Sequence, residues 1–133
     1  MQIFKTTLRV RFAETDAAEI VYYSNFFIYF EVGKMEMFRE LNLPYDRRLP
    51  MIEAHCDFKN TAKFDDLLEI HTTVSEVYEK GFKVVSKIFR SDNGKLIPIA
   101  EGYTIHLTSD LNRKVHFIPE EFKKAFSQQS SSK

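Results

Sequence analysis

One long apolar helical pattern, set among strand patterns, most constrains the fold of this chain. It runs from about Ser24 to Leu41, with large apolar side chains at helical spacing and charged residues on much of the remaining surface. Ser24 or Asn25 is expected to cap this helix, because a short side-chain oxygen accepts a hydrogen bond from a first-turn amide. Gly33 costs about 0.5–1 kcal/mol relative to Ala in a helix interior. We therefore expect a neighbouring backbone to approach the helix at Gly33; a tolerated weak spot is the alternative.

The other regular segments alternate with period two and predict strands. The expected strands are residues 3–12, 51–59, 67–78, 81–91 and 96–107. In the first strand, Phe4, Leu8, Val10 and Phe12 are expected mostly on one side. Turn-forming residues at 79–81 and 91–94 join the last three strands, which should therefore form an antiparallel meander.

A helix this apolar must be covered over much of its surface. The predicted fold is therefore α+β, with one antiparallel sheet wrapped around a central helix. The edges of such a sheet favour dimerisation from strand to strand.

The 133 residues are enough for one domain, which we assign to residues 1–126. A short final helix should begin near Pro119, because proline is favoured in a first helical turn. The segment 127–133, SQQSSSK, is of low complexity and is expected to be a disordered tail.

Composition argues against several classes of protein. Lys plus Arg and Asp plus Glu both number 19, so no strong nucleic-acid or membrane field is implied. No apolar run approaches the roughly 18–20 residues of a membrane span, and MQIFKTTLRV does not resemble a signal peptide. A cytoplasmic protein is expected. The four histidines lack metal-ligand spacing, so no metal site is expected. Cys56 lies in an alternating strand and is interpreted as a core residue.

Asp16 is the main candidate for catalysis. It lies in a short loop just before the long helix, whose first amides lack intrahelical partners. A carboxylate can attack a carbonyl or activate water, and helix-start amides can stabilise negative charge on a carbonyl oxygen. This is the chemistry of acyl transfer. Asp is also common in loops as a turn residue, so the position alone leaves both roles open.

The run FAETDAAEIVYYSNF, from Phe12 to Phe26, resembles the signature of the 4-hydroxybenzoyl-CoA thioesterase family of hot-dog folds. The later run TAKFDD, from Thr61 to Asp66, is similar to a second familial segment. This resemblance implies a hot-dog fold, a homodimer or homotetramer, and hydrolysis of an acyl-CoA bound at the subunit interface. The acyl group would be aromatic, or of short to medium length. No cofactor is implied, because coenzyme A enters as part of the substrate.

The resemblance also implies roles for individual residues. Asp16 matches the catalytic carboxylate, and Tyr23 matches the residue whose backbone amide polarises the thioester carbonyl. Glu31 would line the acyl pocket or assist proton transfer, unless it lies on a solvated helix face. The substrate-binding strand-to-loop segment contains Thr61, Ala62 and Lys63. Lys63, with Lys59, could contact the phosphates of coenzyme A, although solvated surface lysines remain the alternative. His55 could also line the pocket.

Two departures from the family pattern leave alternatives open. Many members have Gly where Glu19 stands, so an acidic side chain could narrow the pocket or change the loop. A branch that acts on short-chain acyl-CoA has His where Tyr23 stands, which favours the aromatic-acyl branch for this chain.

Asp16 could act as nucleophile or as general base. A non-catalytic acyl-thioester-binding protein and a hot-dog dehydratase also remain possible, although dehydratases need a His, and none lies near Asp16.

Overall fold

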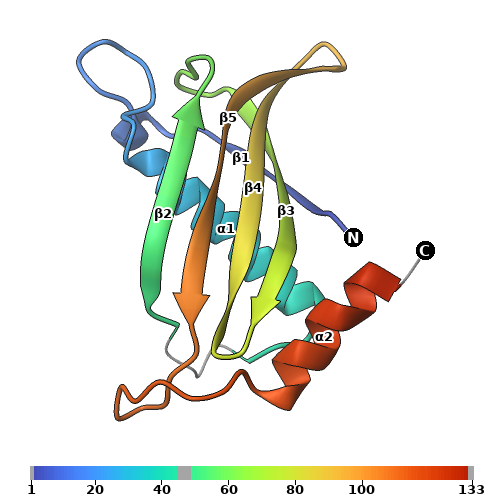
Figure 1. Cartoon of the computed structure of the whole chain (residues 1–133). Coiled ribbons are helices and arrows are strands. Elements are labelled where there is room, and N and C mark those ends of the chain that lie inside the picture. The colour runs from blue at the N-terminus through green and yellow to red at the C-terminus, as the bar shows by residue number, and fades with distance from the viewer. Residues whose placement is uncertain (1, 45–48, 132–133) are drawn as a thin grey trace.

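The computed structural model of this chain describes residues 2–44 and 49–131 (Figure 1). The elements follow in the order β1 (Phe4–Arg9), a 3-10 helix (Phe12–Glu14), α1 (Asn25–Glu40), β2 (Met51–Phe58), β3 (Leu67–Tyr78), β4 (Gly81–Asp92), β5 (Lys95–Leu107) and α2 (Glu120–Ser131). In the described part of the chain, no helix is long and apolar enough to cross a membrane.

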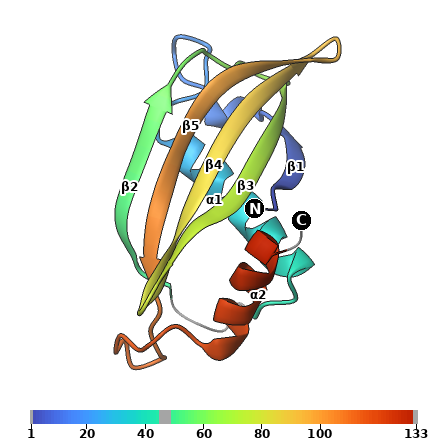
Figure 2. The ribbon, with the colours of Figure 1, turned by 45° about the vertical axis from the view of Figure 1, so that its right-hand side comes forward.

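The strands form one five-stranded sheet in the order β1-β3-β4-β5-β2. Every neighbouring pair is antiparallel, and β3, β4 and β5 form the predicted meander. The sheet curves around α1, while α2 lies beside the far end of α1 (Figures 1 and 2). The predicted α+β architecture, a hot-dog fold with one central helix, is therefore confirmed.

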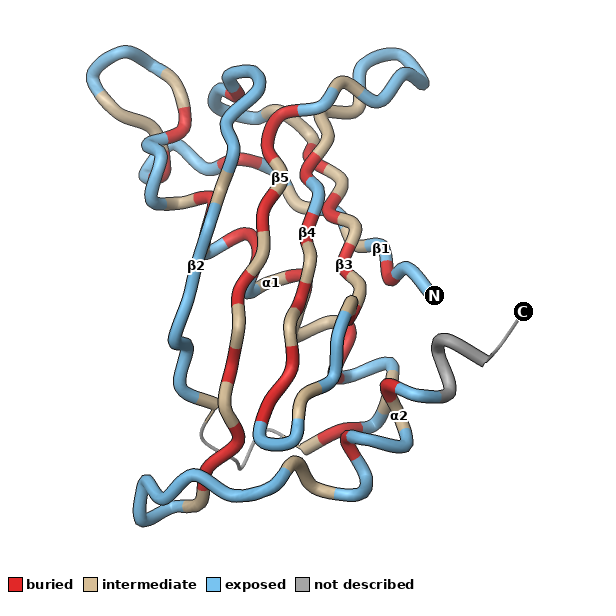
Figure 3. Tube along the Cα trace, viewed as in Figure 1, coloured by how far each residue is buried: buried red, intermediate tan, exposed pale blue. Residues whose placement is uncertain are grey.

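The core lies between α1 and the concave face of the sheet. The helix packs against β1, β3 and β4. One apolar cluster surrounds the first half of α1 and includes Phe26 and Phe30; the other surrounds its second half and includes Phe38 together with Phe122 and Phe126 of α2. Burial alternates along β3, β4 and β5 (Figure 3), as expected for strands with one face on the core.

Gly33 lies where α1 packs closely against β3. A Cβ added there would lie 2.8 Å from Ile70 Cγ2 and would also clash with Thr72 Oγ1. The close approach inferred from the sequence is present, but the side chains of β3 make it, and not a neighbouring backbone.

Three sequence expectations differ from the structure. Strand β1 ends at Arg9, and Phe12, expected on the buried side, is 76% exposed. The chain leaves the sheet because Arg11 and Glu14 close a 3-10 turn. The helix α2 continues to Ser131, so the backbone of residues 127–131 is helical where a disordered tail was expected; residues 132–133 lie outside the described part. No Gly or Pro occurs in SQQSS to end the helix earlier.

The edge strand β2 is exposed on both faces along most of its length (Figure 3). Its apolar residues Met51, Ile52 and Phe58 are 52%, 60% and 52% exposed. Both features follow from the position of α1, which packs against β1, β3 and β4, toward the opposite edge of the sheet from β2.

Candidate active site

Glu14 connects the loop before α1 to the helix itself. It is only 8% exposed, and its carboxylate accepts hydrogen bonds from Arg11 N at 2.9 Å, Arg11 Nε at 2.8 Å and the Tyr29 hydroxyl at 2.8 Å. Burial alone would raise the pKa of Glu14, but the hydrogen bonds from Arg11 and Tyr29 outweigh burial and lower it. Burial, and then the Glu14 carboxylate, raise the pKa of Tyr29.

The backbone of Glu14 also positions the start of α1. Its carbonyl oxygen accepts hydrogen bonds from Tyr22 N at 3.0 Å and from Asn25 Nδ2 at 2.9 Å. Ser24 adopts helical dihedral angles and makes no side-chain cap bond. The predicted cap at Ser24 or Asn25 is therefore wrong, because the Asn25 side chain binds the loop instead of a first-turn amide.

The Asp16 carboxylate is fixed through one of its two oxygens. Oδ1 accepts a hydrogen bond from Ala18 N at 2.9 Å and a longer one from Ile20 N at 3.5 Å. The backbone closes the same turn, with Glu19 N donating to Asp16 O at 2.9 Å. No described residue donates a hydrogen bond to Oδ2. The side chain is therefore oriented, while one oxygen remains available.

The amides at the start of α1 are only partly used. Asn25 N, Phe26 N and Phe27 N donate to the carbonyls three residues earlier, at 2.9, 3.2 and 3.2 Å, and Tyr22 N donates to Glu14. Within the described residues, neither Tyr23 N nor Ser24 N donates to any acceptor. These two amides can stabilise negative charge on a carbonyl oxygen placed at the helix start.

The side chains of Tyr22 and Tyr23 lie together at the surface beside this loop. Their ring centroids are 4.4 Å apart and their hydroxyl oxygens 3.2 Å apart. The hydrogen bond with Tyr23 raises the pKa of Tyr22, and the charge of Asp16 contributes in the same direction. Tyr22 therefore lies within electrostatic reach of Asp16.

Two adjoining clefts share Glu19 and Lys63, and Asp16 lines the first of them. The first is lined by Phe12, Thr15, Asp16, Glu19, Lys63 and Phe64. The second includes Thr61 and Arg90. The structure thus brings Asp16, Thr61 and Lys63 into one region. Ala62 is buried, and its carbonyl accepts a hydrogen bond from Val21 N at 2.8 Å. It therefore helps to fix the loop between Asp16 and α1.

Glu19 occupies a backbone conformation that favours glycine. Its φ is +68°, in the left-handed region. This is the position at which many members of the resembled family have Gly. The chain thus adopts a left-handed turn here with an acidic side chain, which lines both clefts.

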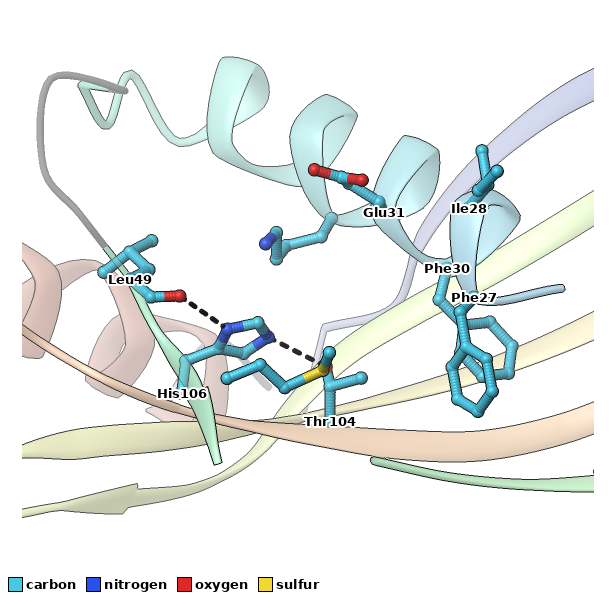
Figure 4. Close-up of a pocket in the computed structure, with 9 residues that line it drawn as sticks. Phe27, Ile28, Phe30, Glu31, Leu49, Thr104 and His106 are labelled. Carbon is cyan, nitrogen blue, oxygen red and sulfur yellow. Dashed lines mark hydrogen bonds between the residues drawn. The ribbon is translucent and has the colours of Figure 1, made fainter. Parts of the chain in front are cut away.

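Glu31 lies in a different cavity, formed where α1 faces β5 and the start of β2 (Figure 4). This cavity has a volume of about 280 Å³ and is lined by Phe27, Ile28, Phe30, Glu31, Lys34, Leu49, Met51, Thr104 and His106. Phe27 and Phe30 point from the helix toward the sheet, and His106 rises from the sheet toward the helix (Figure 4). The sequence reasoning did not identify Lys34 or His106.

Two further candidates from the sequence, His55 and Lys59, do not line the clefts around Asp16. The Nε2 atom of His55 lies 3.1 Å from Asp57 Oδ1, and its ring stacks on Tyr103. Tyr103 alternates with the buried Thr104 and therefore faces away from α1, so His55 lies on the outer face and does not line this site.

Lys59 pairs with Glu101 at 3.5 Å. Cys56 is partly buried against the core, and burial, assisted by Asp57, raises the pKa of its thiol to about 11. Among the described residues, no group of His, Cys, Asp and Glu side chains is arranged to hold a metal ion.

Comparison with known proteins extends these observations. The sequence model of the Thioesterase-like superfamily matches residues 10–126. The acyl-CoA thioesterase YbgC of Haemophilus influenzae is 30% identical, over 73% of this chain and 87% of that protein. The crystal structure of a hypothetical protein from Aquifex aeolicus is 31% identical, with a TM-score of 0.85 over 92% of this chain and 98% of that one. The 4-hydroxybenzoyl-CoA thioesterase of Pseudomonas sp. strain CBS-3 shares the fold, with a TM-score of 0.84 at 21% identity over 94% and 99% of the two chains.

Proposed function

This chain belongs to the Thioesterase-like superfamily and is a thioester hydrolase, and we propose that it hydrolyses an acyl-CoA through Asp16 and the Tyr23 amide. One observation carries this proposal. The free oxygen of Asp16 and the unused amides at the helix start belong to one loop, which Glu14 holds against α1. A carboxylate and an oxyanion donor fixed together suit attack on a thioester carbonyl.

Hydrolysis of the thioester can follow either of two routes, and each accounts for every bond formed and broken. In the first, an Asp16 oxygen attacks the carbonyl carbon, the oxyanion binds the Tyr23 amide, and the thiolate of coenzyme A leaves and takes a proton from water. Water then cleaves the mixed anhydride, giving the free acid and restoring Asp16. In the second route, Asp16 takes a proton from water as the water attacks, and the departing thiolate receives that proton. In heavy-oxygen water, label in the Asp16 carboxylate would identify the first route with water attacking the Asp16 carbonyl of the anhydride, because the second route never adds an oxygen to Asp16.

The two clefts suggest how the substrate lies. Lys63 is exposed and lines both clefts, beside Thr61 and Arg90 in the second. We place the phosphates of coenzyme A near Lys63, with Thr61 and Ala62 supporting the pantetheine arm. The acyl group, aromatic or of short to medium length, would extend along α1 toward Glu31. In this scheme coenzyme A belongs to the substrate, and every catalytic group comes from the chain itself.

We further propose that the working form is a homodimer, or a dimer of such dimers, joined through the β2 edge. The exposed backbone edge of β2 and its exposed Met51, Ile52 and Phe58 side chains support this proposal. A second copy would cover the β2 edge of the sheet, which lies beyond the strands that α1 packs against.

Substitution of Asp16 tests the catalytic assignment. Asp16→Asn keeps the size of the side chain but removes its charge, and loss of a positioned general base costs about 10²–10⁴ in rate. Turnover of the best substrate in a screen of aromatic, short, medium and long acyl-CoAs should fall at least ~100-fold, with binding retained. Tyr23→Phe should have a small effect, because the proposed donor is a backbone amide.

Each variant also has a result that would contradict the scheme. Near-normal turnover by Asp16→Asn would remove this residue from the mechanism. A large loss in Tyr23→Phe would mean that the phenol itself participates. If the unaltered protein binds acyl-CoA but hydrolyses none of the screen, the acyl-CoA thioesterase proposal is wrong.

A further inference from the structure

The cavity between α1 and β5 contains polar groups that the proposed chemistry does not use. Most of its wall is apolar, with Phe27, Phe30, Leu49 and Met51. Lys34 and His106 are polar groups set into that wall. Polar groups in an apolar cavity require partners, because leaving them unpaired is costly. The partners of these two residues therefore indicate what the cavity can bind.

His106 is fully partnered within the protein. Its Nδ1 lies 3.2 Å from Leu49 O and its Nε2 lies 2.9 Å from Thr104 Oγ1 (Figure 4). A neutral imidazole satisfies both contacts, with Nδ1–H donating to the carbonyl and Nε2 accepting from the threonine hydroxyl. Burial, and then the charge of Lys34, lower the pKa of His106 to about 4, which is consistent with a neutral ring. Both ring nitrogens of His106 are therefore already used within the protein, and neither is left to bind a ligand.

Lys34 is not partnered. It is half-buried, and no described residue forms an ion pair or a hydrogen bond with its ammonium group. Glu31, three residues earlier, raises the pKa of Lys34, but burial has the larger effect and lowers it. Glu31 is exposed and makes no ion pair with Lys34. The cavity thus presents a half-buried cation that makes no close ion pair with a described residue, although the exposed Glu31 lies on the same wall.

We propose that this cavity receives the far end of the acyl group, and that Lys34 selects acyl groups that end in a carboxylate. The inference rests on the proposed function. The apolar walls suit a hydrocarbon chain, and a terminal carboxylate would supply the charge-assisted partner that Lys34 lacks. The substrate class is therefore the mono-thioester of a dicarboxylic acid with coenzyme A.

The spacing along α1 sets the length of such a chain. Phe27 lies one helical turn beyond Tyr23, so the cavity begins about 6 Å along the axis from the proposed oxyanion amide. Lys34 lies about 16 Å beyond Tyr23 along the axis, and helical side chains lean back toward the N-terminus. An acyl chain of medium length can therefore connect the two sites, whereas a very short one cannot.

The test compares matched acyl-CoAs that differ only in a terminal carboxylate. The pairs are succinyl-CoA with butyryl-CoA, adipoyl-CoA with hexanoyl-CoA, and suberoyl-CoA with octanoyl-CoA. The protein should favour the carboxylate member in at least one of the two longer pairs, but not in the shortest pair. Lys34→Met should lower kcat/KM for that favoured carboxylate substrate about 10-fold or more, while its neutral partner changes little. Lys34→Arg should keep much of the preference, and Lys124→Met, on exposed α2, should keep all of it.

Binding provides a measurement that is independent of turnover. In an Asp16→Asn background, calorimetry should show tighter binding of the favoured carboxylate substrate than of its neutral partner, and Lys34→Met should abolish the difference. Hydrolysis of the neutral members with no preference for a carboxylate, or equal losses for both members in Lys34→Met, would overturn this inference and leave the proposed function intact. If none of these thioesters is hydrolysed or bound, this inference is wrong, and the proposed function is then decided by the aromatic and long members of the wider screen.

Discussion

The position of Asp16 depends on Glu14, whose carboxylate and carbonyl bind the loop, Arg11 and α1 together. Glu14→Gln keeps the shape but removes the charge and one acceptor. We expect kcat to fall about 10-fold with a smaller change in KM, because the attacking oxygen and the oxyanion amide would move relative to each other. The free energy of unfolding should fall by about 1–3 kcal/mol. Steady-state kinetics and urea unfolding measure the two effects separately.

Two controls accompany this prediction. Tyr29→Phe removes one of the hydrogen bonds to Glu14 and should have a smaller effect in the same direction. Glu36→Gln removes an exposed partner of Arg39 on the same helix and should change neither quantity appreciably. If Glu14→Gln lowered stability while leaving kcat intact, Glu14 would have only a structural role.

His106 predicts a specific pH dependence of stability. Its folded-state pKa is about 4, against 6.5 for the free side chain, because burial and Lys34 disfavour the charged ring. Between pH 6.5 and 4 the unfolded chain binds a proton that the folded chain does not. The stabilisation is therefore complete above 6.5 and is lost progressively as the pH falls toward 4. From the two pKa values, the loss should reach about 3 kcal/mol.

Urea unfolding at several pH values, compared with His106→Asn, isolates this contribution from that of Glu14 and the other carboxylates. Lys34→Met should raise the pKa of His106, since the charge of Lys34 is one cause of its depression. An NMR titration of His106 in the folded protein with a midpoint near 6.5 would contradict the prediction.

Sequence reasoning named some residues of the candidate site and missed others for physical reasons. Asp16, Thr61 and Lys63 belong to local motifs, and the fold brings those motifs together. Sequence reasoning assigned no separate role to Glu14, because its burial depends on Tyr29, 15 residues further along the chain. The spacing of Arg11 and Glu14 was a weak signal of the turn. Lys34 gave no sequence signal, since only the packing of α1 against the sheet shows that it is desolvated.

At the scale of elements, the sequence predicted the strands better than the ends of elements. Strong period-two alternation gave β3 and the β3–β4–β5 meander almost residue by residue. The first strand was drawn too long, because the alternating pattern continues to Phe12 after the chain has left the sheet. The helix α2 is anchored by Phe122 and Phe126, and composition alone does not show where a helix without a terminating Gly or Pro ends.

The contact between α1 and β3 gives a prediction for Gly33. Gly33→Ala improves helix propensity by about 1 kcal/mol, but its Cβ would overlap Thr72 Oγ1 and press on Ile70. Overpacking typically costs about 1–3 kcal/mol, so we expect a net loss in the free energy of unfolding. Thr72 Oγ1 is buried and has no hydrogen-bond partner in the described structure. Thr72→Ala should therefore recover part of the loss.

Chemical denaturation of the two single variants and the double variant measures this coupling. Thr72→Ala alone also leaves a small cavity, which the new methyl group at position 33 would partly fill. The combined variant should thus be more stable than the sum of the two single effects implies. Strict additivity would mean that the helix shifts away from β3 instead of packing against it.

At the scale of the whole molecule, the β2 edge of the sheet is left uncovered by the described part of the chain. The helix α1 packs on β1, β3 and β4, whereas β2 ends the sheet with exposed apolar side chains and an unpaired backbone edge. Met51 of β2 also lines the cavity that contains Lys34. The second copy proposed above would therefore also close one side of the proposed acyl pocket, so we expect assembly and activity to be interdependent.

We expect a homodimer, or a dimer of dimers, at micromolar concentration, measured by sedimentation. Ala54 is exposed in the middle of β2. Ala54→Glu would place two carboxylates in a joined β2 edge, where their desolvation opposes association. The variant should shift toward monomer and lose activity together, whereas Lys124→Glu on α2 should change neither. Hydrogen exchange adds a backbone measurement, because the β2 amides that face away from β5 should be protected in the dimer and exchange quickly in the Ala54→Glu monomer. A fully active monomer with unprotected β2 amides would show that one chain forms the complete site.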